Sequence, residues 1–204
     1  MHFTGTKHLH EIENIMQEIP NFLPKGHGGT VLKKEMEDCI RGQPPPDSYE
    51  EMMSALMAGI GYKPLGERVS RYLKESEGKS VSYRNEKHKA VFGEITAKMD
   101  KQNYALLSAL YLLTADYRLW KIMKHYTQKN AVNFAGVSLK GIHENGYTLY
   151  CVAKDLYLGT KHLSVSDLAD TELIRPQIFM LVCNAMAVRR FGLKAVRLAE
   201  KGKK

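Results

Sequence analysis

The sequence predicts a mainly α-helical protein made of two small helical modules joined by a short polar linker. Three observations lead to this prediction. Apolar residues recur at helical spacing along the chain, capping residues with glycine or proline bracket these runs, and the net charge changes sign at one polar stretch. A chain of 204 residues with 44% hydrophobic and 25% charged residues is long enough to bury a core in one medium or two small domains.

The boundary between the modules is predicted within Lys74–Ser82, a polar stretch that contains Gly78. Residues 1–78 carry 9 basic and 12 acidic side chains, whereas residues 79–204 carry 21 basic and 10 acidic ones. The net charges are therefore −3 and +11, which together make the +8 of the chain. We expect an acidic N-terminal module (1–78) with Gly/Pro loops and a basic C-terminal helical domain (79–204). A second break is predicted at Gly42–Asp47, where three consecutive prolines cannot continue a helix.

In the first module, apolar spacing and breaker residues predict four helices. They cover residues 12–19, ended by Pro20, and 31–41, between Thr30 and Gly42. Asp47–Glu50 has the spacing of a capping box and opens a Met-rich helix that ends near Gly59. The last helix of this module is expected over residues 65–75.

The second module shows clearer helical patterns. Its first apolar face combines Val91, Phe92, Ile95 and Met99, and one strongly helical run spans Tyr104–Lys124. The next predicted elements are a helix over Gly146–Leu158 capped by Asn145 and stopped by Gly159, a short helix after the capping box Ser164–Asp167, and a long helix with Pro176 in its first turn that Gly192 kinks or ends.

Several protein classes are disfavoured by composition. Met1–His10 is polar and lacks the apolar core of a signal peptide. The longest apolar stretch, near residues 105–115, is too short to cross a bilayer. The three cysteines, Cys39, Cys151 and Cys183, are odd in number and widely spaced, which is typical of reduced thiols. We therefore expect a cytoplasmic protein without a membrane segment.

No cofactor or metal motif is predicted. Gly78-Lys79-Ser80 matches the end of a phosphate-binding loop, but the required first glycine is replaced by Leu73. The chain contains no C-x-x-C and no H-E-x-x-H. The N-terminal histidines could approach one another in a folded loop, but surface positions are the favoured interpretation; they are His2, His8, His10 and His27.

A polar turn after the predicted helix 146–158 contains candidates for acid–base chemistry, namely Asp155, His162 and Asp167. Helix capping is the favoured explanation for residues of these types at such positions, so no catalytic residue is assigned. An enzyme with a site between the two modules remains an alternative, with His88, His162 or Asp155 in that site.

The strongest functional signal is a group of basic residues at the C-terminus, and a weaker one lies in the helical run 104–126. Five aromatic residues crowd the run 104–126, and those near its cations could stack nucleic-acid bases, although core packing is expected for most of them; they are Tyr104, Tyr111, Tyr117, Trp120 and Tyr126. At the C-terminus, basic residues with spacings of 4, 3 and 4 would form one stripe on a continuous helix. The predicted binding surface comprises Arg118, Lys121, Lys124, Arg189, Arg190, Lys194, Arg197 and Lys201.

Four blocks of sequence carry a resemblance to a known group of proteins. They are Ala109–Asp116 with Leu119–Trp120, Ala153–Tyr157 with Gly159–His162, Leu168–Asp170, and Arg189–Gly192. Through them, residues 83–192 resemble uncharacterised proteins of phages and integrative mobile elements of Gram-positive bacteria. The resemblance implies a domain of unknown function and a mobile-element origin, and it transfers no catalytic residue.

The favoured hypothesis is a non-catalytic interaction protein that binds a host nucleoprotein or defence complex. Inhibition of a nucleic-acid-guided nuclease, as anti-CRISPR proteins achieve it, is one concrete form. A DNA- or RNA-binding accessory or regulatory protein is the second hypothesis, and the small enzyme described above is the third. The sequence makes no prediction of the oligomeric state.

Overall fold

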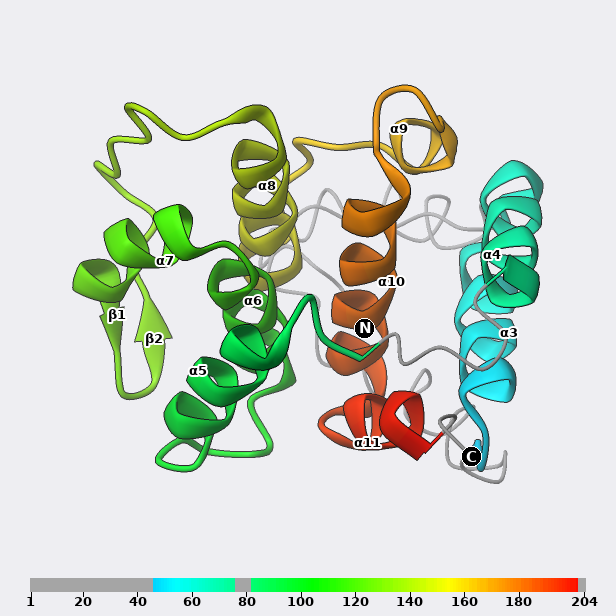
Figure 1. Ribbon diagram of the computed structural model, residues 1–204, viewed down its shortest axis with the longest axis horizontal. Helices are drawn as coiled ribbons and strands as arrows, with labels where there is room; N and C mark the ends of the chain where they lie inside the picture. Colours follow the sequence, from blue (N-terminus) through cyan, green and yellow to red (C-terminus); the bar gives the residue numbers. More distant parts are fainter. Residues whose placement is uncertain (1–45, 76–81, 202–204) are drawn as a thin grey trace, which may run out of the picture. The chain divides into compact units, whose positions relative to one another are not determined.

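The computed structural model describes residues 46–75 and 82–201 (Figure 1). The chain divides between Pro45 and Pro46 into two compact units, and the described residues belong to the second. This unit is mainly helical, which confirms the predicted fold class. The helices predicted over residues 12–19 and 31–41 lie outside the described residues, as do the four N-terminal histidines and Cys39.

The helices follow one another with short connections, and a hairpin is inserted after α7. The α-helices are α3 (Tyr49–Ile60), α4 (Lys63–Glu75), α5 (Glu86–Thr96), α6 (Tyr104–Ala115), α7 (Tyr117–Met123), α8 (Glu144–Leu158), α9 (Val165–Ala169), α10 (Pro176–Phe191) and α11 (Lys194–Lys201). A 3-10 helix, η2 (Lys124–Tyr126), continues α7 and leads into strands β1 (Thr127–Gln128) and β2 (Ala131–Val132). The strands are antiparallel, with Thr127 opposite Val132.

Helix α6 lies at the centre of this unit. It has no charged residue, and every residue from Leu106 to Ala115 is buried. A helix that is apolar all round is stable only when other elements cover it on every side. Accordingly, α6 packs against α5, α7, α8 and α10, which surround it in Figure 1.

A chain of buried hydrogen bonds links α6 to α10 and α3. The amide of Asn184 on α10 accepts a hydrogen bond from the Tyr49 hydroxyl at 2.7 Å and donates one to the Tyr111 hydroxyl at 3.2 Å. The Tyr111 hydroxyl in turn donates to the carbonyl of Ser82. Buried polar groups require such partners, so this chain fixes the relative placement of three helices.

The single helix predicted over Tyr104–Lys124 is in fact two helices, because Asp116 interrupts it. Asp116 adopts an extended conformation (φ −118°, ψ 122°), and its Oδ1 accepts hydrogen bonds from the N–H groups of Arg118 and Leu119, each at 3.0 Å. A short carboxylate favours this capping geometry over a helix interior. The break turns α7 into a new direction.

Other predicted caps are confirmed or shifted by a few residues. The capping box at Ser164 and the proline in the first turn of α10 are confirmed. Helix α3 is capped by Ser48 rather than Asp47 and ends at Ile60 before Gly61. Helix α8 begins two residues before the predicted start, because the His143 side chain accepts a hydrogen bond from the Gly146 N–H.

Gly192 ends α10, and the chain turns before α11 begins at Lys194. Its φ of 67° favours glycine, and a Cβ at this position would lie 2.6 Å from the Tyr104 ring. The predicted stripe Arg190, Lys194, Arg197 and Lys201 therefore does not lie on one helix. This part of the sequence prediction is wrong, since it assumed a continuous helix across Gly192.

Helices α3 and α4 pack within the same unit as the helices that follow them. Helix α3 contacts α10 and α11, and α4 contacts α9. Arg68 on α4 is buried and donates hydrogen bonds to the carbonyls of Leu168 at 2.7 Å and Asp170 at 2.6 Å, and to that of Ile174. Helix α4 thus packs against a helix of the predicted C-terminal module, and the division of the chain into two units lies within the predicted break at Gly42–Asp47.

Candidate functional site

Helix α7 and the first residue of η2 present three of the predicted cations to solvent. Leu119 and Met123, one turn apart, are fully buried. At 3.6 residues per turn, the opposite side of the helix carries, in order around its axis, Trp120, Lys124, Tyr117, Lys121 and Arg118. Arg118, Lys121 and Lys124 are all exposed, so this part of the predicted binding surface lies where a partner can reach it.

Trp120 and Lys124 line a groove of about 640 Å³ between α5, η2 and the β1–β2 hairpin, which we name the Trp120 groove. Apolar contacts come from Trp120, Ile95 and Met99. Positive charge comes from Lys98 after α5, Lys124 on η2 and Lys129 in the hairpin turn, while polar groups are supplied by Glu94, Thr127 and Gln128. This size suits a small organic group with one apolar face.

In the part of the chain that the structure describes, the cations of the Trp120 groove form no ion pair with a carboxylate, although Glu94 lines the same groove. Within residues 46–75 and 82–201, no carboxylate forms an ion pair with Lys98, Lys124 or Lys129. The same is true of Arg118 and Lys121. Clustered cations of this kind produce a local positive potential that attracts anionic partners.

Two smaller hollows continue the groove along the line where α5 faces α7. The first, of about 40 Å³, is lined by Trp120, Tyr117 and Lys87 among others, so it shares Trp120 with the groove. The second, of about 430 Å³, again includes Tyr117 and adds Arg84 and Arg118. Shared residues therefore connect the three hollows, and we name their combined lining the α5–α7 seam.

Asp116 anchors one end of the α5–α7 seam. Its Oδ2 lies 3.1 Å from Nη1 of Arg84 and 3.2 Å from Nε2 of His143. Burial alone would raise the pKa of this carboxyl, but the Leu119 N–H, His143 and Arg84 together hold it below its ordinary value. Asp116 is thus a charged cap that neutralises Arg84, and it leaves Arg118 uncompensated.

The C-terminal cations of the predicted surface are placed differently. Nη1 of Arg190 donates to the Ala55 carbonyl at 2.7 Å, and a Cβ on Gly59 would lie 2.7 Å from the same atom, so α3 approaches this guanidinium closely. Nε of Arg189 donates to the Leu156 carbonyl at 3.1 Å.

The remaining C-terminal cations lie on α11. Nζ of Lys194 is 3.9 Å from Asp47, and Arg197 is exposed. The Lys201 side chain lies outside the described residues. Figure 1 shows α5 and α6 between α11 and α7, so the α11 backbone lies apart from the cations at α7.

Asp155 and His162 are brought together, but in a structural arrangement. Nδ1 of His162 lies 2.7 Å from Oδ1 of Asp155. The same carboxylate accepts hydrogen bonds from the N–H groups of His162 and Leu163 and from the Thr160 hydroxyl. Burial raises the pKa of Asp155, but these hydrogen bonds outweigh burial and hold the pKa below its ordinary value. The carboxylate holds the loop after α8 in place.

His88 is also occupied. It is 2% exposed, its Nδ1 accepts from the Arg84 N–H at 3.1 Å, and its Nε2 donates to the Tyr111 carbonyl at 2.8 Å. Burial raises the pKa of the thiols of Cys151 and Cys183, the latter to about 12, so neither is activated as a nucleophile. His88 and the two thiols therefore supply no activated group to the enzyme alternative.

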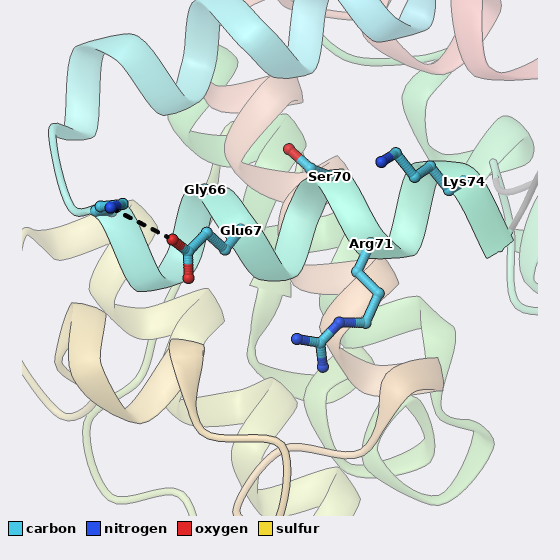
Figure 2. Close-up of a pocket in the computed structure, with 6 residues that line it drawn as sticks. Gly66, Glu67, Ser70, Arg71 and Lys74 are labelled. Atoms are coloured by element: carbon cyan, nitrogen blue, oxygen red, sulfur yellow. Dashed lines mark ion pairs between the residues drawn. The ribbon is translucent and has the colours of Figure 1, made fainter.

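A further hollow, of about 540 Å³, lies along α4 and is shown in Figure 2. Lys63 forms an ion pair with Glu67 at 3.8 Å. Arg71 points away from the side on which Ser70 and Lys74 lie. These side chains do not converge on a common point, so we assign no site here.

Comparison with known proteins adds no family. No protein-family model matches the chain, and no curated protein and no solved structure matches it either. Among the described residues, no helix is both long enough and apolar enough to span a membrane. The same residues contain no group of three or more His, Cys, Asp or Glu side chains that could hold a metal ion.

Sequence reasoning missed most of the Trp120 groove. Lys98, Met99 and Lys129 belong to the groove but were not among the predicted binding residues. The hairpin that carries Lys129 was not predicted, because two-residue strands leave almost no periodic signal. A weak signal exists in the Lys129-Asn130 pair between Thr127 and Val132, which suits a tight turn.

Proposed function

We propose that this protein acts by binding rather than by catalysis, and that its partner is a nucleoprotein complex. The observation that carries the proposal is the exposed cationic side of α7 beside the Trp120 groove. Within the described residues, the side chains of Arg118, Lys121 and Lys124 form no ion pair with a carboxylate. A compact unit that keeps several cations uncompensated next to an apolar wall is suited to a polyanion that also offers flat apolar groups.

Charge over the whole unit supports the same proposal. Residues 46–204 carry 25 basic and 16 acidic side chains, a net charge of +9. Asp116 and Asp155, which are only partly available to solvent, are each bound to an internal cation or histidine. The unit thus carries a net positive charge, which accelerates association with an anionic partner.

The resemblance of residues 83–192 to phage and mobile-element proteins supports a particular class of partner. A host defence complex that contains nucleic acid, such as a nucleic-acid-guided nuclease, offers an anionic surface. A mobile element benefits from binding such a complex, because the complex attacks it. Inhibition of such a nuclease in the manner of anti-CRISPR proteins is the form of activity that we propose to test first.

The test uses affinity capture from a host lysate at low salt, with absorbance at 260 and 280 nm to detect nucleic acid. A triple variant, Arg118→Gln, Lys121→Gln and Lys124→Gln, is compared with a control triple, Lys140→Gln, Lys161→Gln and Arg175→Gln. Both remove three positive charges from exposed positions. We expect the triple variant at residues 118, 121 and 124 to capture no complex. For the same variant, the slope of the logarithm of heparin affinity against the logarithm of salt concentration should become shallower by about 2 to 3.

Equal loss in both triples would show that only total charge matters and would reject the α7 surface. Capture of no protein and no nucleic acid by the unaltered chain would reject the proposed function itself.

A further inference from the structure

We infer that the α5–α7 seam binds single-stranded nucleic acid, with bases stacked on Trp120 and Tyr117 and phosphates held by the cations beside them. This inference rests on the proposed function, and it names the component of the partner that the seam contacts. It follows from the aromatic rings, from the spacing of the charges around them, and from the continuity of the three hollows.

The two aromatic rings stand on one side of α7, three residues apart. Tyr117 is 62% exposed, which is unusual for a large aromatic residue next to a packed core. Trp120 is partly exposed and lines both the Trp120 groove and the adjoining small hollow. Both rings therefore present surface to solvent, and stacking on an aromatic face is favourable for every base.

Cations flank both rings. Nζ of Lys87 lies 4.0 Å from the centre of the Tyr117 ring. Lys98, Lys124 and Lys129 reach the Trp120 groove from three different elements. A repeating polyanion needs positive charges at intervals along its path, and these residues supply them along a seam that runs from the hairpin to Arg118.

Single strands fit this arrangement better than duplex or acidic protein. In a duplex the bases are paired and stacked on one another, so they cannot reach Trp120 without being flipped out. An acidic peptide would place hydrated carboxylates against the apolar side chains of Ile95 and Met99, and this desolvation is unfavourable. An unpaired base offers an apolar face to the groove while its phosphate stays at the rim.

Trp120 is the only tryptophan of the chain, so its fluorescence reports on the groove alone. The full chain is titrated with a short oligothymidylate at low salt, and in parallel with a duplex of equal phosphate concentration and with polyglutamate. We expect saturable quenching by the oligothymidylate and little quenching by the other two. Affinity for a fluorescein-labelled oligothymidylate is measured separately by anisotropy.

Variants divide stacking from charge. Trp120→Leu should weaken oligothymidylate binding by about 5- to 100-fold, whereas Trp120→Phe should retain most of the affinity because it keeps a stacking face. The groove triple Lys98→Gln, Lys124→Gln and Lys129→Gln should lower the log–log salt slope by about 2. The control triple at residues 140, 161 and 175 should change neither quantity, and circular dichroism identifies any variant that does not fold.

The outcomes separate the inference from the proposed function. Binding detected by anisotropy without Trp120 quenching, or equal quenching by duplex, would overturn the seam as a single-strand site and leave the proposed function standing. Quenching by polyglutamate in place of oligothymidylate would assign the seam to an acidic protein surface. Failure of every polyanion to bind would remove both proposals together.

Discussion

The buried imidazole of His88 should make the protein sensitive to mild acid. Burial among the rings of Tyr83, Phe92 and Tyr111 is the main cause that lowers its pKa from 6.5 to about 4; the hydrogen bond to the Tyr111 carbonyl acts in the opposite direction, and the Arg84 charge lowers the pKa further. In the unfolded chain the imidazole binds a proton below pH 6.5, while in the folded protein it stays neutral to about pH 4. Acidification through this window therefore favours the unfolded state.

The difference between the His88 pKa of 6.5 in the unfolded chain and about 4 in the folded protein corresponds to a loss of about 3 kcal/mol of unfolding free energy between pH 7.5 and pH 4. Chemical denaturation followed by circular dichroism measures this loss, and His88→Gln is the comparison, because an amide can occupy the site without titrating. We expect the variant to be less stable at pH 7.5 but to show a flatter pH dependence above pH 5. There, carboxylates such as Asp116 and Asp155, whose folded pKa values are lowered, contribute little to the slope.

A variant that lost stability with the same slope as the unaltered protein would refute this account of His88. Proton NMR offers a second measurement that needs no variant. The ring protons of His88 should not shift until the pH approaches 4, and a titration midpoint near 6.5 would contradict the burial of a neutral imidazole.

Three further predictions concern stability and the assignment of the basic surface. Arg190→Gln should lower the unfolding free energy by about 1.5 to 3 kcal/mol, because it removes a charged donor from the Ala55 carbonyl. The same variant should bind heparin as tightly as the unaltered protein. Reduced heparin affinity at unchanged stability would return Arg190 to the binding surface. Tyr111→Phe should lower the unfolding free energy, measured by denaturant, by about 1 to 3 kcal/mol, because the Asn184 amide and the Ser82 carbonyl both lose the Tyr111 hydroxyl. An unchanged unfolding free energy would show that this chain of hydrogen bonds does not stabilise the core. Asp116→Ala should lower the melting temperature more than Asp116→Asn, which keeps a capping oxygen; identical effects would mean that the cap is not what stabilises α7.

Local signals were sufficient for the helices and for one part of the site. The proline at the start of α10 and the capping box of α9 act within a few residues, so their sequence patterns transfer directly to the structure. The exposure of Arg118, Lys121 and Lys124 is of the same kind, because helical periodicity places them opposite Leu119 and Met123. Asp116 was a missed local signal. Aspartate is a common capping residue, but the apolar residues on both sides of Asp116 led to the prediction of one continuous helix.

Other features depend on contacts between distant parts of the chain. Residues 118 and 190 are both arginines, but their surroundings differ. Arg190 donates to a carbonyl of α3 that is 135 residues away along the chain, whereas Arg118 faces solvent. The Trp120 groove requires α5 and the hairpin to meet at α7, and no pattern within any one of these segments predicts that meeting.

The sequence by itself determined that the chain is mainly helical, where several helices begin and end, and that its second half carries an excess of positive charge, since these properties follow from composition and short-range geometry. Only the tertiary structure decided which cations remain available to a partner and which apolar surface lies beside them. The physical reason is that burial and hydrogen bonding of long side chains depend on whichever distant backbone packs against them, and the packing at Gly192 and Asp116 redirected both basic segments.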